Sequence, residues 1–246
     1  MDQTWKLQFA AAGIQAIGFD LDGTLLDSDP AEEDAFVKMW EFVTGNPCPD
    51  AALATYLEEL EAISRAWDEG LVSANELGGP AIRRAAVKAG LHADPAQLPA
   101  LEEIYLQVAA SHGHLFPEVP LCLERLLGTL PLAILTNGPA ELQRRKVEGA
   151  GLNRWVDVIH ISGQTGVAKP DIAAFERLAA EVGCAPNRMA FLGDSAGSDI
   201  LGASKAAMRT VWINRHGDPY PRRLPTPWAV AADVQTALEA LAHPNS

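Results

Sequence analysis

The sequence predicts an α/β protein with a doubly wound parallel sheet as its core and an inserted, all-helical second domain. Short apolar runs that suit buried strands alternate with amphipathic helical segments over much of the chain. After the first of these runs, by contrast, residues 28–114 contain only helical patterns. The alternation predicts a parallel sheet with helices on both faces, and the helical block predicts a smaller domain inserted after the first strand.

The expected core comprises residues 1–27 and 115–246. Its strands are predicted from five short apolar runs, at 14–19, 132–135, 156–161, 189–192 and 210–213. Helices are predicted at 118–127, 139–150, 171–182 and 199–206, and a last helix follows a proline-rich loop at 218–228. Ligands of such sheets bind at the carboxyl ends of the strands, so the residues that follow each strand are the candidate functional residues.

The inserted block, residues 28–114, is expected to be a helical domain. Pro30 suits a first helical position, and the helix that starts near Asp50 has a single apolar face. The segment Ser73-Ala-Asn-Glu76 has the pattern of a capping box, and residues 98–108 form another amphipathic face.

Net charge restricts the expected partners, and the cysteine pattern indicates the expected compartment. With 32 acidic and 19 basic residues the net charge is −13, which disfavours a nucleic acid or an anionic membrane as partner. The three cysteines are far apart and form no CxxC pair, so we expect reduced thiols and a cytoplasmic protein. The apolar patch at 7–19 is preceded by only one basic residue, Lys6, against Asp2, and it runs into two acids, which disfavours a signal peptide. Oligomeric state has no signature in the sequence.

Two aspartates directly follow the first predicted strand. Asp20 and Asp22 end the run Ile17-Gly-Phe19 and precede Gly-Thr. Burying two carboxylates close together is costly unless something compensates their charge. The pair therefore predicts a compensating group at this strand end.

Other strand ends deliver groups that fit the same chemistry: Thr136-Asn137-Gly138, Lys169, and the acids Asp194 and Asp199. Mg²⁺ prefers carboxylate oxygens and binds through one or two of them plus a substrate phosphate. Lysine and threonine side chains can hold phosphoryl oxygens by charge and hydrogen bond. These residues predict Mg²⁺-dependent phosphoryl chemistry with an aspartate as the available nucleophile.

At these positions the sequence resembles the haloacid dehalogenase-like hydrolase superfamily. Four short motifs occur in that superfamily's order: DLDGT at 20–24, LTNG at 135–138, AKPD at 168–171 and GDSAGSD at 193–199. The helical block takes the place of a C1-type cap. The resemblance implies a Rossmann-like core, a cap that closes over the substrate, and hydrolysis of a small phosphorylated metabolite. A nucleotide, a sugar phosphate and a glycolate-type phosphate all stay open as substrates.

The resemblance also implies roles for single residues. Asp20 would attack phosphorus to form an aspartyl-phosphate, and Asp22 would protonate the leaving group and then activate water. Thr136, Asn137 and Lys169 would bind the phosphoryl group.

For the metal, the resemblance implies Asp20, Asp194 and the backbone carbonyl of Asp22 as ligands of Mg²⁺. Asp199 would bind the ion through water or orient a neighbouring group. By contrast, the basic run Arg144-Arg145-Lys146 is expected to be a solvent-exposed helix face.

Three other functions stay open at this point. The 2-haloacid dehalogenases of the superfamily usually carry an aromatic residue where this chain has Asp22, which favours a phosphatase. A phosphosugar mutase keeps both acids. A non-catalytic binding module is disfavoured because both acids are intact.

Overall fold

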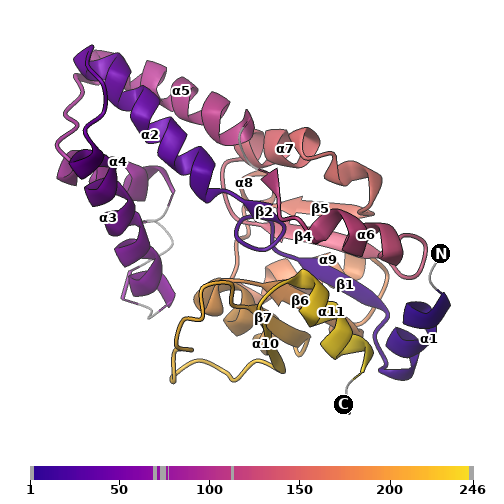
Figure 1. Ribbon diagram of the computed structural model, residues 1–246. Helices are drawn as coiled ribbons and strands as arrows, with labels where there is room; N and C mark the ends of the chain where they lie inside the picture. The colour runs from indigo at the N-terminus through magenta and orange to yellow at the C-terminus, as the bar shows by residue number, and fades with distance from the viewer. Residues whose placement is uncertain (1–2, 69–70, 73–75, 77, 112–113, 244–246) are drawn as a thin grey trace. The chain divides into compact units, whose positions relative to one another are not determined.

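The computed structural model describes residues 3–68, 71–72, 76, 78–111 and 114–243 (Figure 1). The chain divides into two compact units. We call residues 1–27 with 114–246 the sheet unit, and residues 28–113 the helical unit. Residues 73–75 of the predicted capping box lie outside the described residues.

A six-stranded parallel sheet with the strand order β5-β4-β1-β6-β7-β8 forms the centre of the sheet unit. Its strands are β1 (Ala16–Phe19), β4 (Leu132–Thr136), β5 (Val158–Ile161), β6 (Met189–Gly193), β7 (Arg209–Ile213) and β8 (Ala229–Ala231). The doubly wound parallel sheet predicted from the sequence is confirmed. The edge strand β8 was not predicted, because three residues carry no readable periodicity.

Helices cover both faces of this sheet (Figure 1). On one face pack α1 (Gln3–Ala11), α6 (Val119–Leu126) and α11 (Val234–Ala242), and on the other α9 (Ile172–Glu181) and α10 (Leu201–Lys205). The remaining elements of the sheet unit are α7 (Ala140–Gly149), α8 (Ser162–Thr165), the antiparallel pair β2 (Leu26–Asp27) and β3 (His114–Leu115), the 3₁₀ turns Leu152–Arg154 and Pro186–Arg188, and a π-helical turn at Ala196–Ile200. Helix α1 was not predicted, although its Trp5 and Phe9 are buried one turn apart.

Strand β1 is buried on both faces, as a central parallel strand should be. Ile17 and Phe19 pack into the core beneath α6 and α11. On the opposite face, a Cβ atom at Gly18 would lie 2.8 Å from side-chain atoms of both Met189 and Phe191. Close packing thus fixes the strand whose end bears Asp20.

The helical unit contains α2 (Asp29–Thr44), α3 (Asp50–Asp68), α4 (Gly79–Lys88), a 3₁₀ turn at Pro95–Gln97 and α5 (Leu98–Ser111). The rings of Phe36 and Tyr56 stack in its core with their centroids 4.1 Å apart. The buried Glu59 carboxylate forms ion pairs with Arg84 and Lys88. Within the described part of the chain, no helix is long and apolar enough to cross a membrane.

A buried histidine gives the sheet unit a pH-dependent stability. His160 of β5 is 3% exposed, and its ring nitrogens have no hydrogen-bond partner among the described residues. Burial lowers the pKa of the imidazole. As pH falls below about 6.5, the unfolded chain therefore binds a proton that the folded chain resists, and the free energy of unfolding falls.

We expect His160→Leu to remove this loss of stability. Between about pH 7.5 and about pH 5.5, the variant should lose less unfolding free energy than the parent chain. Urea unfolding at the two pH values measures this, with exposed His216 replaced by Leu as the control. An equal loss in all three proteins would show that His160 is not the group responsible.

Candidate functional site

The strand order places the candidate site at a switch point of the sheet. Strands β4 and β5 lie on one side of β1, and β6, β7 and β8 lie on the other. Asp20 directly follows β1, Asp194 follows β6, and Thr136 ends β4. Ligands of doubly wound sheets bind where the strand order reverses, beyond the carboxyl ends of the strands.

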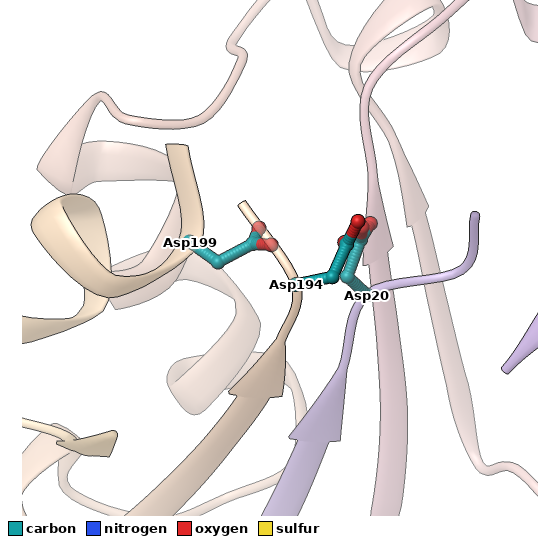
Figure 2. A group of neighbouring side chains, drawn as sticks. All are labelled: Asp20, Asp194 and Asp199. Carbon is teal, nitrogen blue, oxygen red and sulfur yellow. The ribbon is translucent and has the colours of Figure 1, made fainter. Parts of the chain in front are cut away.

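Three carboxylates converge at this edge. Asp20, Asp194 and Asp199 each offer an oxygen, and these oxygens all lie within 4.8 Å of one another (Figure 2). Asp199 comes from the π-helical turn and is fully buried, and Asp20 is 7% exposed. Hard oxygen donors at this spacing suit a divalent cation such as Mg²⁺.

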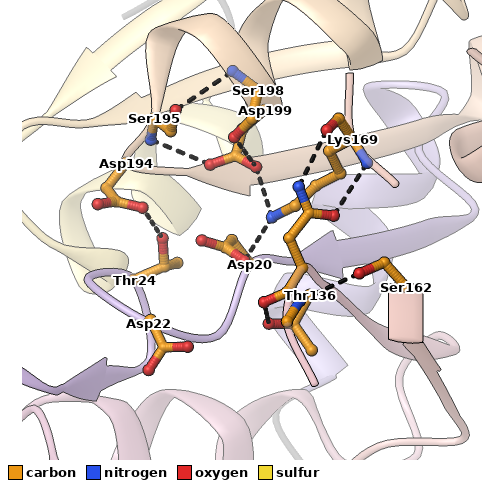
Figure 3. Close-up of polar contacts among 12 residues, drawn as sticks. Asp20, Asp22, Thr24, Thr136, Ser162, Lys169, Asp194, Ser195, Ser198 and Asp199 are labelled. Atoms are coloured by element: carbon orange, nitrogen blue, oxygen red, sulfur yellow. Dashed lines mark hydrogen bonds and ion pairs between the residues drawn. The ribbon is translucent and has the colours of Figure 1, made fainter. Parts of the chain in front are cut away.

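One buried ammonium group lies against the cluster. Nζ of Lys169 donates to Oδ1 of Asp20 at 2.5 Å and to Oδ1 of Asp199 at 2.7 Å (Figure 3). The other Asp199 oxygen accepts a hydrogen bond from the Ser195 backbone N–H at 3.0 Å. Asp199 therefore pairs with Lys169 in this structure, and its role toward a metal ion stays a prediction.

The charges within the cluster do not balance. Burial and the charge of Asp199 raise the pKa of Asp20 to about 7, although Lys169 opposes the shift. Burial, Asp20 and Asp199 likewise raise the pKa of Asp194. Burial disfavours the charge on Lys169, but Asp199 and Asp20 outweigh it and raise the lysine's pKa. Three carboxylates against one ammonium leave an excess of negative charge that a divalent cation would neutralise.

The turn after β1 is shaped around Asp194. Gly23 has φ +75°, and a Cβ atom there would lie 2.2 Å from Oδ2 of Asp194, so only glycine fits. The Thr24 hydroxyl donates to Oδ1 of Asp194 at 3.4 Å. The Arg215 guanidinium donates to the carbonyl oxygens of Gly23 and Thr24 at 3.1 and 2.8 Å. Sequence reasoning assigned no such role to Arg215, because it lies 191 residues further along the chain.

The predicted phosphate-binding residues Thr136 and Asn137 lie beside Lys169. The Asn137 amide pairs with the Lys169 backbone, accepting from its N–H and donating to its carbonyl, both at 2.9 Å. The observed role of this side chain is to fix the lysine's backbone, and its contact with phosphate stays a prediction. Thr136 Oγ1 accepts from Nε2 of Gln143 at 2.6 Å.

Asp22 lies apart from the three clustered carboxylates (Figure 3). Its Oδ1 accepts from Nζ of Lys146 at 2.8 Å, and its Oδ2 accepts from Nε2 of Gln143 at 2.7 Å. The expectation that Lys146 is solvent-exposed is wrong, because this lysine is buried, whereas Arg144 is exposed as expected and Arg145 is partly exposed.

A signal for this burial was present in the sequence. Lys146 lies one turn after Leu142 and directly before Val147, both of which are buried, so it falls on the apolar face of α7.

Fold and site define an α/β protein with a carboxylate-rich centre that is suited to a divalent cation. A family model for haloacid dehalogenase-like hydrolases matches residues 14–207. The chain therefore belongs to this family of hydrolases, as its four motifs indicated.

Curated relatives include several phosphatases. The chain is 41% identical over 102 residues to a phosphoserine phosphatase from Thermus thermophilus, and 32% identical over 133 residues to the pyrimidine 5′-nucleotidase YjjG from Escherichia coli. These matches cover 41% and 54% of this chain but only 41% and 59% of those relatives. Human N-acylneuraminate-9-phosphatase is 24% identical over 90% of this chain and 91% of its own length.

Solved structures share the fold. The putative hydrolase YfnB from Bacillus subtilis, determined with bound magnesium, superposes with a TM-score of 0.77 at 25% identity, over 94% of this chain and 98% of YfnB. A 2-haloacid dehalogenase from Pseudomonas syringae pv. Tomato superposes with a TM-score of 0.63 at 27% identity, over 94% of this chain and 99% of that one. The structural neighbours thus include both magnesium-binding and dehalogenase members.

Proposed function

We propose that this chain is a Mg²⁺-dependent phosphatase that hydrolyses a small phosphomonoester through an aspartyl-phosphate on Asp20. The observation that carries the proposal is the cluster of Asp20, Asp194 and Asp199 with Lys169 at the switch point of the sheet. The phosphatases among the curated relatives support it.

The donor set fits magnesium. Asp20 and Asp194 supply carboxylate oxygens, and the backbone carbonyl of Asp22 is the third group that we expect to contribute. Asp199 is occupied by Lys169 and the Ser195 N–H, so we propose that it supports the site without binding the ion directly. When bound, the ion would neutralise the excess negative charge and polarise a phosphoryl oxygen.

The residues of this chain suggest a two-step reaction. An Asp20 oxygen bonds to phosphorus while the bond from phosphorus to the leaving-group oxygen breaks, and Asp22 donates a proton to that oxygen. Asp22 then takes a proton from water, whose oxygen bonds to phosphorus as the bond to Asp20 breaks. Inorganic phosphate and free Asp20 result. Lys169 and Thr136 would hold phosphoryl oxygens throughout.

For the helical unit we propose the role of a cap that selects the leaving group. Its support is the position of residues 28–113 in the sequence, as an insertion between the first and second motifs. The substrate class stays a small phosphorylated metabolite.

A second candidate activity comes from the dehalogenases among the structural neighbours. In that reaction an aspartate displaces halide from carbon and no phosphate is released. The acid at position 22 favours the phosphatase, because a departing alcohol oxygen needs a proton and a departing halide does not.

The experiment that tests the proposal is phosphate release from a panel of phosphomonoesters, in Mg²⁺ and in EDTA. The panel would hold nucleoside monophosphates, sugar phosphates, O-phosphoserine and p-nitrophenyl phosphate, with halide release from 2-chloropropionate as a parallel assay. We expect turnover with Mg²⁺, a fall of at least about 100-fold in EDTA, and recovery when Mg²⁺ is restored. Halide release without phosphate release would contradict the phosphatase and favour the dehalogenase activity.

A further inference from the structure

Two buried donors on one face of α7 converge on the Asp22 carboxylate. Gln143 and Lys146 are spaced i, i+3, and are 2% and 5% exposed. Each donates to a different oxygen of Asp22, Gln143 at 2.7 Å and Lys146 at 2.8 Å. A carboxylate that accepts a hydrogen bond at each of its two oxygens has both its plane and its position fixed.

Gln143 also ties Asp22 to the expected phosphate site. The same Nε2 group donates to Thr136 Oγ1 at 2.6 Å. Its stem packs against Gly138, where a Cβ atom would lie 3.1 Å from Cγ of Gln143. The amide therefore holds the Asp22 carboxylate and the Thr136 hydroxyl at a fixed separation.

The Lys146–Asp22 ion pair is expected to contribute little to folding stability. Burying an ammonium group carries a desolvation cost that offsets most of its attraction to a carboxylate. The Asp22 side chain is itself 33% exposed, so solvent weakens the attraction further. What the pair does provide is a defined location for one carboxylate beside the site.

We propose that Lys146 and Gln143 are positioning residues that hold the Asp22 carboxylate where it exchanges protons with the leaving group and with water. This inference rests on the proposed function and adds two residues to it. Neither is expected to touch the substrate. Proton transfer by a side chain depends on its being held within hydrogen-bond reach of the reacting oxygen.

If Lys146 positions Asp22, removing its ammonium group should lower kcat most for esters whose leaving group must be protonated as it departs. An alkoxide is a poor leaving group and needs protonation as it departs, whereas p-nitrophenolate leaves without it. For Lys146→Met we expect kcat to fall about 100-fold with the best aliphatic ester of the panel, and less than about 5-fold with p-nitrophenyl phosphate. KM should stay within about 3-fold for both esters.

Three further variants complete the test. Lys146→Arg keeps a cation and should restore kcat for the aliphatic ester to within about 5-fold of the parent. Arg145→Met removes a neighbouring, partly exposed cation of α7 and should leave kcat for both esters unchanged. In an Asp22→Asn background, adding Lys146→Met should lower kcat further by less than about 3-fold, because the carboxylate that Lys146 positions is already absent.

The possible failures are distinct. Equal losses on both esters, or a full additional loss in the Asp22→Asn background, would overturn the positioning role while leaving the phosphatase intact. A folded parent chain that hydrolyses neither ester would overturn the proposed function, and the inference with it.

Discussion

Asp20→Asn is expected to lower phosphate release by at least about 10⁴-fold, because the amide keeps the shape of the side chain but is no nucleophile. Steady-state assays in Mg²⁺ with the best ester of the panel measure the loss. Asp34→Asn, which alters an exposed carboxylate of α2, is the matched control and should keep full activity.

Stability should move in the opposite direction in the metal-free variant. The pKa of Asp20 is raised to about 7 by burial and by Asp199, whereas the unfolded chain releases this proton near pH 4. The folded metal-free protein therefore loses stability as pH rises from about 4 to about 7. Asn carries no charge, so the variant should be more stable than the parent at neutral pH in EDTA. A variant that loses both activity and stability would point to general damage.

Lys169→Met has the second largest expected effect. It removes the buried ammonium that forms ion pairs with Asp20 and Asp199 and so leaves the repulsion among the clustered carboxylates unopposed by this charge. We expect kcat/KM to fall about 10³-fold, since a group that stabilises the transferring phosphoryl charge is lost. Unfolding free energy at neutral pH in EDTA should fall by about 3 kcal/mol, as is typical when one partner of a buried ion pair is removed.

The control for this variant is Lys205→Met, which removes an exposed lysine from α10. Phosphate assays and urea unfolding of both proteins, with and without Mg²⁺, separate the two effects. If Lys169→Met lost no more activity than Lys205→Met, Lys169 would have no part in phosphoryl transfer.

The central fold was predictable because its strands are buried on both faces. Runs such as Ile17–Phe19 and Leu132–Leu135 are continuously apolar, and the helices between them show a clear periodicity. Helix α1 and strand β8 were not predicted from the sequence. Strand β8 has only three residues, and α1 is held by contacts of its Trp5 and Phe9 with core residues distant in the sequence, so local sequence pattern identifies neither element.

The carboxylate cluster could also be anticipated, because parallel strands end at one edge and β1, β4 and β6 each lead into a candidate site residue there. The contacts of Asp22 with Gln143 and Lys146 could not be anticipated from the sequence. Lys146 stands in a run of basic residues that resembles a solvated surface, and its partner lies 124 positions earlier in the chain. Asn137 illustrates the same limit, since its amide contacts the Lys169 backbone 32 positions away.

The most direct test of the proposed mechanism is to trap the phosphoryl group on Asp20. Asp22→Asn should slow hydrolysis of the intermediate, and p-nitrophenyl phosphate should still form it, because p-nitrophenolate departs without a proton. After acid quench, peptide mass spectrometry should find one phosphoryl group on the peptide that contains Asp20, removable by hydroxylamine as expected of an acyl phosphate. Stoichiometric release of p-nitrophenolate with no phosphoryl group on Asp20 would contradict the account.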